Sequence, residues 1–170
     1  VAPGPQRLQT LIQTEAVSKR FKEVLGKRAP AFMSSIISAV NANKALKECD
    51  PMSVISAAAV AAALDLPINS SLGFAHIVPY GNAAQFQIGW KGFVQLALRT
   101  GQYRTINAAV IYDGQLVKLD PFTGDMVFKP ERASETVTGY LLYFKLLNGF
   151  EKYFYMTTAE CEAHGKRYSA

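Results

Sequence analysis

The stretch that decides the fold is QFQIGWKGFVQLALRTG, residues 85–101. Its first four residues alternate polar and apolar side chains, which predicts a β-strand. From Trp90 the apolar residues recur at helical spacing, and Gly101 follows as a residue that commonly ends a helix. A strand that runs directly into a helix predicts a mixed fold at the centre of the chain.

Helices are predicted on the N-terminal side of this stretch. Apolar residues at helical spacing predict one helix over residues 6–25 and a second over residues 31–47. A third begins with Asp50 as its N-cap and Pro51 at its first helical position, and it ends before Pro67. The first part of the chain is therefore predicted to be helical throughout.

Strands are predicted around the stretch and after it. Two short strands flank a turn at residues 80–82. Hairpins are predicted about Asp113-Gly114 and Asn148-Gly149, because both dipeptides favour two-residue hairpin turns. The last helix begins TTAE, which has the spacing of a capping box. The predicted fold class is α+β, with N-terminal helices packed on an antiparallel sheet of hairpins, an inserted helix and a C-terminal helix.

Length and composition favour one globular domain. The 170 residues are enough to bury a core, and 49% hydrophobic with 18% charged residues excludes a disordered chain. No linker, repeat or low-complexity tract interrupts the sequence, so a single domain is predicted over residues 1–170. No apolar run approaches the roughly 20 residues that span a bilayer. Cys49 and Cys161 lie far apart, which favours free thiols in a reducing cytoplasm.

The distribution of charge says more than the net charge of +5. From Leu66 to Tyr112 there is no Asp or Glu, while Lys91, Arg99 and Arg104 all fall inside this segment. A surface without carboxylates suits contact with phosphates, because an acid there would repel them. A buried middle with few charges of either sign explains the pattern equally well.

The helix predicted from Trp90 carries a basic ridge. At about 100° per residue, Lys91, Gln95 and Arg99 fall within an ~80° sector, and apolar residues fill the remaining arc. The apolar side, including Phe93 and Leu96, is expected to face the core. The ridge fits either a phosphate-binding surface or an ordinary solvated face.

Polar and aromatic residues precede this helix. Gln85 and Gln87 are expected to share one face of their strand, and with Tyr80 and Asn82 they would form an uncharged surface beside the ridge. Amides and aromatic rings contact bases and sugars without demanding a sequence. Trp90 fits two roles, because it can stack on a base or fill the corner between strand and helix.

Catalytic groupings are scarce. His76 and His164 have no acidic or cysteine neighbours at ligand spacing, and no paired carboxylates suggest a nuclease metal site. There is no Walker-type phosphate loop. GWKG matches the G-x-x-G loop of KH domains, but here it joins a strand to a helix instead of two helices. The sequence predicts a protein that is not an enzyme and needs no cofactor or metal.

Two blocks, residues 66–82 and residues 85–115, resemble the RecT family of phage and prophage single-strand annealing proteins, the RecT/Redβ-type recombinases. The similarity runs from about Arg28 to the end of the chain, and CDPMS at residues 49–53 also fits the family. The matching positions are Leu72, Gly73, Ala75, Pro79, Tyr80, Gly81, Asn82, Gln85, Ile88, Gly89, Trp90, Lys91, Gly92, Leu96, Ala97, Arg99, Gly101 and Gln102.

The resemblance implies a DNA-annealing and oligomerisation domain. Such a protein binds single-stranded DNA as a ring or helical filament and pairs complementary strands without ATP, in phage-type homologous recombination and repair. It also implies the cytoplasm of a bacterial host and a 5′→3′ exonuclease partner. The C-terminal region that the family links to this partner is expected to lie outside these residues. Only two alanines separate Asn82 from Gln85, where some members carry a longer insertion with lysines.

These arguments assign expected DNA contacts. The phosphate contacts are Lys91, Arg99 and Arg104; the residues near sugars and bases are Tyr80, Asn82, Gln85 and Gln87; the stacking candidates are Trp90 and Tyr103; the candidates for a second strand are Lys27 and Arg28. Apolar residues of the first helices, such as Leu8, Ile12 and Ile36, are expected either at a subunit interface or inside one subunit. A single-strand-binding module that does not anneal is the alternative function, and a metal-dependent nuclease is a third.

Overall fold

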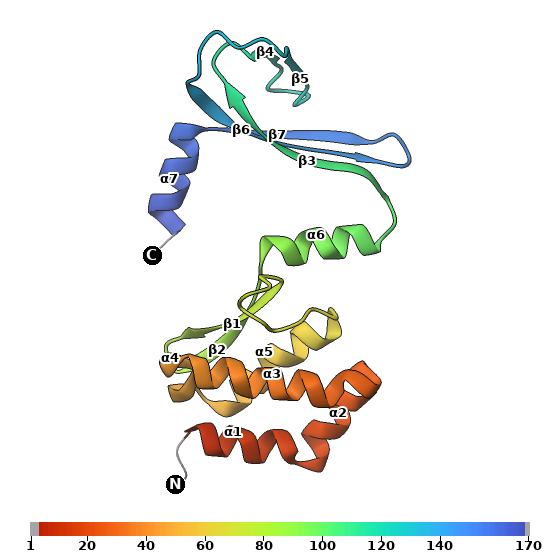
Figure 1. Ribbon diagram of the computed structural model, residues 1–170, viewed down its shortest axis with the longest axis vertical. Coiled ribbons are helices and arrows are strands. Elements are labelled where there is room, and N and C mark those ends of the chain that lie inside the picture. The colour runs from red at the N-terminus through yellow and green to blue at the C-terminus, as the bar shows by residue number, and fades with distance from the viewer. Residues whose placement is uncertain (1–3, 169–170) are drawn as a thin grey trace. The chain divides into compact units, whose positions relative to one another are not determined.

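The computed structural model describes residues 4–168, and the chain divides into two compact units (Figure 1). Unit 1 runs to Arg99 and unit 2 begins at Thr100. The predicted order of elements is confirmed: helices come first, then antiparallel strands with one inserted helix, then a final helix. The prediction that the two units act as one domain stays a prediction.

Unit 1 begins with five short helices and one helical turn. They are α1 (Gly4–Gln13), α2 (Glu15–Leu25), η1 (Gly26–Arg28), α3 (Ala29–Ala42), α4 (Lys44–Glu48) and α5 (Pro51–Ala63). The single helix predicted over residues 6–25 is wrong, because it breaks at Thr14, whose hydroxyl donates to the carbonyl oxygen of Leu11 at 2.7 Å. The predicted second helix breaks at Asn43, whose side chain accepts from the backbone of Ala45 and caps α4.

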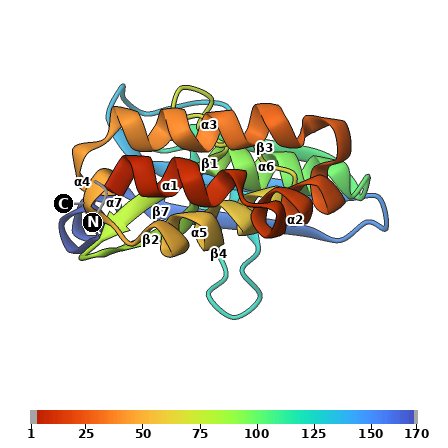
Figure 2. The same cartoon turned by 90° about the horizontal axis from the view of Figure 1, so that it is seen from below.

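The core of unit 1 forms where α1 lies alongside α3 and α5, as Figure 2 shows. Helix α5 begins as predicted, because the Asp50 carboxylate accepts a hydrogen bond from the Ser53 backbone at 3.0 Å. Small alanines along α5 are buried, so neighbouring backbones approach closely. Leu8, Ile12 and Ile36 are buried in this core. Of the two roles expected for them, the structure supports packing inside one subunit.

A hairpin and a helix complete unit 1. Strands β1 (Ala75–Tyr80) and β2 (Ala83–Ile88) pair in antiparallel register, and α6 (Trp90–Arg99) begins one residue after β2. The side of the hairpin that carries Ala75, Ile77 and Ala84 is buried against the helices. The strand-to-helix order predicted from residues 85–101 is therefore confirmed.

Unit 2 contains a three-stranded antiparallel sheet in the order β3 (Tyr103–Tyr112), β6 (Val137–Leu146), β7 (Glu151–Thr157). A separate ribbon pairs β4 (Leu116–Leu119) with β5 (Met126–Phe128).

One of the two predicted hairpins of unit 2 is confirmed. The hairpin about Asn148-Gly149 joins β6 to β7. The hairpin about Asp113-Gly114 is wrong, because β3 pairs with β6 and not with β4. The backbone of Asp113 instead bonds to Ala133 and Thr136, which directs the chain out of the sheet.

The last helix, α7 (Thr158–Tyr168), starts with the predicted capping box. The backbone N–H and hydroxyl of Thr157 donate to the Glu160 carboxylate at 2.8 Å, and the Glu160 backbone donates back to the Thr157 hydroxyl. These hydrogen bonds from the Thr157 backbone and hydroxyl lower the pKa of Glu160. The α+β fold class is confirmed. Within Gly4–Tyr168, no helix has the length and apolar character needed to cross a bilayer.

Replacing Gly92 by alanine is expected to lower the free energy of unfolding of unit 1 by about 1–3 kcal/mol, the usual cost of overpacking. The added methyl group would collide with the carbonyl oxygen of Phe74. Urea unfolding followed by the fluorescence of Trp90, the only tryptophan, measures the change.

The matched control is Gly165→Ala in α7, where an added methyl group meets no other atom. This substitution is expected to be neutral or to stabilise unit 2 by about 0.5–1 kcal/mol, because alanine is the better helix former. Unfolding of unit 2 is followed by circular dichroism. Equal effects of the two substitutions would contradict the close-packing account.

Candidate nucleic-acid interface

The corner between β2 and α6 depends on close approach of backbones. A side chain at Gly89 would collide with the backbone of Gly73, and a side chain at Gly92 would collide with the backbone of Phe74. The Gly89 N–H donates to the Phe74 carbonyl oxygen at 2.9 Å and ties the corner to the start of β1. The glycines of GWKG therefore serve the packing of the chain on itself, which explains the KH-like pattern without a bound ligand.

The outer face of the β1–β2 hairpin is polar. Gln85 and Gln87 are exposed on the side away from the core, so the predicted shared face is confirmed. His76 stands opposite Gln87 in the ladder, and Tyr80, 74% exposed, lies at the tip beside the exposed Asn82. We call this surface, made of His76, Val78, Tyr80, Gln85 and Gln87, the hairpin face. It carries no carboxylate.

Trp90 and Lys91 follow the hairpin face along the chain. The Trp90 side chain is 71% exposed, so it does not fill the corner of unit 1. Lys91 lays its aliphatic stem over Gly73, and its Nζ atom lies 5.8 Å from the centre of the Trp90 ring. This cation–π arrangement presents an aromatic plane and a positive charge together. This exposure excludes the corner-filling role considered for Trp90, and stacking on a base stays a prediction.

Helix α6 is turned differently from the prediction. Gly92, Leu96 and Arg99 fall in a ~60° sector, and this sector packs against unit 1. Leu96 contacts the core as expected, but Phe93 is 60% exposed within the described chain, so its expected core position is wrong. The glycine allows the closest backbone contact, and it therefore decides which side of the helix faces inward.

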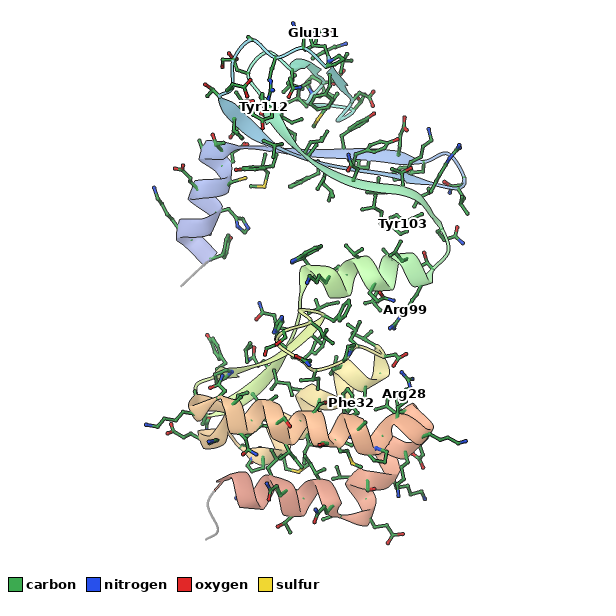
Figure 3. All side chains as sticks on the ribbon, viewed as in Figure 1. Arg28, Phe32, Arg99, Tyr103, Tyr112 and Glu131 are labelled. Atoms are coloured by element: carbon green, nitrogen blue, oxygen red, sulfur yellow. The ribbon has the colours of Figure 1, made fainter. Side chains whose placement is uncertain are left out.

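Arg99 makes contacts within the fold, where the sequence suggested a solvated ridge. Its guanidinium donates to the carbonyl oxygens of Leu64 at 2.8 Å and Asp65 at 2.7 Å, immediately after α5. Cations at helix C-termini satisfy such carbonyl groups and oppose the helix dipole. Figure 3 shows Arg99 reaching from α6 toward the side of unit 1 where Arg28 lies. Arg99 therefore anchors the end of α6 to the end of α5.

Asp65 joins two arginines. Its carboxylate pairs with Arg28, which follows α2, and lies 3.9 Å from the guanidinium of Arg99. Asp65 has a φ of 51°, a conformation that Asp and Asn tolerate better than most residues. Two guanidinium groups around one carboxylate leave a surplus positive charge. Lys27 is exposed beside Arg28 and adds to it.

In unit 2 the two predicted contacts differ in exposure. Tyr103 is half-buried, and its ring packs 5.6 Å from that of Phe144, while Arg104 is exposed. Near Arg104, Glu151 accepts hydrogen bonds from the Tyr143 hydroxyl at 2.7 Å and from Lys145 at 3.0 Å.

The hydrogen bond to Glu151, followed by partial burial, raises the pKa of Tyr143 to about 12, so this tyrosine is neutral at physiological pH. The hydrogen bonds from Tyr143 and then Lys145 lower the pKa of the Glu151 carboxyl. The expected DNA contacts of Tyr103 and Arg104 stay predictions.

The structure thus separates the candidate residues into three groups. The hairpin face leads to Trp90 and Lys91, and Arg28 and Arg99 meet at Asp65 about 12 Å of helix rise from Lys91. Tyr103 and Arg104 belong to unit 2. Sequence reasoning missed Asp65, whose only signal was its place between a helix and the Leu66-Pro67 stop. No group of three metal-ligating side chains occurs among residues 4–168.

Comparison with known proteins gives one family. The model of the RecT family matches residues 30–170. The uncharacterized protein YqaK of Bacillus subtilis (strain 168) is 53% identical over 163 residues, which cover 95% of this chain and 57% of YqaK. Protein RecT of Escherichia coli (strain K12) is 30% identical over 128 residues, 69% of this chain and 48% of that protein. The chain spans about half the length of the curated relatives it matches.

Arg99→Ala is expected to lower the free energy of unfolding of unit 1 by about 1–2 kcal/mol, because two charged hydrogen bonds to the α5 end are lost. Arg99→Lys is expected to lose less of this free energy than Arg99→Ala but more than wild type, because an ammonium group cannot bond to both carbonyl groups as the planar guanidinium does. Urea unfolding followed by far-ultraviolet circular dichroism provides the measurement.

Lys91→Ala is the control for this prediction. The Lys91 head group makes no ion pair with any described residue and contributes only an exposed cation–π contact with Trp90, so its loss is expected to lower stability by about 0.5 kcal/mol. If Arg99→Ala proves as mild as Lys91→Ala, the anchoring role of Arg99 is wrong.

Proposed function

This chain belongs to the RecT family, and from that premise we propose that it binds single-stranded DNA and anneals complementary strands without ATP. The observation that carries the proposal is that the exposed hairpin face is followed directly along the chain by exposed Trp90 and Lys91. Together these residues combine amide groups, aromatic rings and a positive charge, and the segment from Leu66 to Tyr112 contributes no acid to them.

The chemistry of this surface suits a strand held by its backbone. Lys91 is assigned to a phosphate, and Trp90 and Tyr80 are assigned to stack on bases. Gln85, Gln87 and Asn82 are assigned to sugars and base edges. Stacking and amide contacts tolerate any base, so the pairing edges can remain available to a second strand. Annealing requires this availability.

Charge has to come from several places, because two polyanionic strands repel one another. Arg104 in unit 2 is assigned to a phosphate, and Tyr103 is kept as a weaker stacking candidate. Arg99 is assigned mainly to the fold, with Lys27 and Arg28 beside it as candidates for a second strand. Annealing makes and breaks no covalent bond, so the proposal assigns no residue a catalytic role.

The proposal includes assembly and partners. We assign the chain to a homo-oligomer, either a ring or a helical filament, that takes part in phage-type recombination and repair in the cytoplasm of a bacterial host. A 5′→3′ exonuclease would supply its single strands. Mass measurement of the protein with and without complementary oligonucleotides tests the assembly.

The alternative is a module that binds single strands without annealing them. The two functions differ in one observable, the rate at which complementary oligonucleotides form duplex. A fluorescence-quenching assay is expected to show faster pairing with the protein than without it, with no effect of added ATP. Binding without acceleration would support the alternative, and metal-dependent cleavage of labelled DNA would support a nuclease.

Lys91→Ala is expected to weaken binding to a dT oligonucleotide and to reduce the slope of log affinity against log salt by about 0.7, the loss of one phosphate contact on a single strand. Lys19→Ala removes the same charge from α2, where no hairpin-face residue lies, and is the matched control. Fluorescence anisotropy at several salt concentrations measures both slopes. An unchanged slope for Lys91→Ala would remove this residue from the interface.

Trp90→Ala is expected to cost about 1–3 kcal/mol of binding free energy, and Trp90→Phe less, because stacking on a base needs an aromatic plane and no particular donor. The stability of unit 1 is expected to change little, since the ring is exposed. Oligonucleotide titrations of the folded variants give the comparison. Equal affinity of wild type and Trp90→Ala would assign Trp90 no contact with DNA.

A further inference from the structure

A separate pocket of about 450 Å³ lies within unit 1. Its lining comes from the last residue of α2, from η1, from the first half of α3, from the loop at residues 65–72 that follows α5, and from the end of α6. None of its lining residues belongs to the hairpin or to the first turn of α6. It is therefore distinct from the surface assigned above.

The floor and rim of this pocket are apolar. Leu66 and Ile68 are buried in the floor, and Leu72 stands 43% exposed at the rim. The half-buried ring of Phe32 lines one wall and is held from behind by Phe21, with 5.7 Å between ring centres. Such a compartment suits a flat, largely apolar group, because apolar and aromatic side chains dominate ligand pockets.

Charge is confined to one side of the pocket, where Arg28, Asp65 and Arg99 meet. A guanidinium carries five N–H donors. Arg28 uses one hydrogen bond on Asp65 and is 64% exposed, so its other donors are open to an additional anion. A nucleotide matches this arrangement, because its anionic phosphate would meet the arginines while its flat base entered the apolar compartment.

The remaining polar groups of the lining are already used inside the protein. The Ser35 hydroxyl donates to the Phe32 carbonyl oxygen at 2.7 Å, and the Asn69 side chain accepts from the Ser71 backbone at 2.9 Å. These groups give the pocket little means to distinguish one base from another.

We propose that this pocket receives one nucleobase of the bound single strand against Phe32, with the adjoining phosphate on Arg28. The inference rests on the proposed function, and it assigns Arg28 to the strand held on the hairpin face in place of the second strand named for it above. A base in this pocket is removed from pairing, so the pocket sets the register of the strand on each subunit while the hairpin face leaves its bases available.

Filling the pocket tests the inference. Ala31 is exposed on α3 and lines the pocket, so Ala31→Phe fills the pocket and leaves both arginines in the sequence. Ser38→Phe, on an exposed position of α3 outside the pocket, is the matched control. Affinity is measured for a dT oligonucleotide and for an abasic strand of equal length and charge.

Ala31→Phe is expected to bind the dT strand about tenfold more weakly than wild type, near the low end for one base–aromatic contact, and the abasic strand equally well. Ser38→Phe is expected to match wild type on both strands. A dT strand carrying 5-iodouracil is expected to crosslink wild-type protein at Phe32 on irradiation. The crosslink needs no variant, so it tests the pocket even if Ala31→Phe fails to fold.

Unchanged affinity of folded Ala31→Phe for the dT strand, or crosslinks that avoid residues 28–35, would overturn the inference. An equal loss on dT and abasic strands would also overturn it, because the variant would then act on phosphates alone. These results leave the proposed function in place. Failure of the wild-type protein to bind single strands at all would instead reject the proposed function.

Discussion

The close contact between the first turn of α6 and the backbone at Gly73 and Phe74 determines most of the interface. Gly89 and Gly92 permit it, because any side chain at either position would meet that backbone. The contact turns the apolar arc of α6 outward at Trp90 and Phe93. It also fixes the direction in which α6 runs, so Arg99 reaches the end of α5. The small residues of GWKG thus position Trp90, Lys91 and Arg99 through packing of the chain on itself.

The basic side chains of unit 1 consequently make different kinds of contact. Lys91 keeps its charge beside an exposed aromatic ring. Arg99 satisfies carbonyl groups at the end of α5, and Arg28 shares Asp65 with it. A strand on this unit would meet a mobile point charge at one end of α6 and a prearranged arginine pair at the other. A lysine ammonium binds phosphate as a point charge, while a planar guanidinium fixes the orientation of the phosphate. The start of α6 therefore suits attraction of the DNA backbone, and its end suits a defined position of the strand.

The sequence predicts the parts of this fold that depend on near neighbours. Alternation placed Gln85 and Gln87 on one face, and local capping chemistry located Asp50 at the start of α5. The sequence patterns could not predict contacts between residues that lie far apart in the chain. The partners of Arg99 lie 34 and 35 residues away, and the Asp113 backbone bonds to Ala133 and Thr136 in an irregular segment before β6, which redirects a turn expected to form a hairpin. Helical periodicity also misjudged α6, because it counts apolar side chains and ignores how closely a glycine packs.

The central claim is that single-stranded DNA lies along the hairpin face and the start of α6. Hydrogen–deuterium exchange of the whole chain, with and without a dT oligonucleotide, tests it directly. The account predicts slower exchange over residues 76–91 when DNA is present, and unchanged exchange in α2. Protection confined to other segments, with residues 76–91 exchanging equally fast in both conditions, would contradict it.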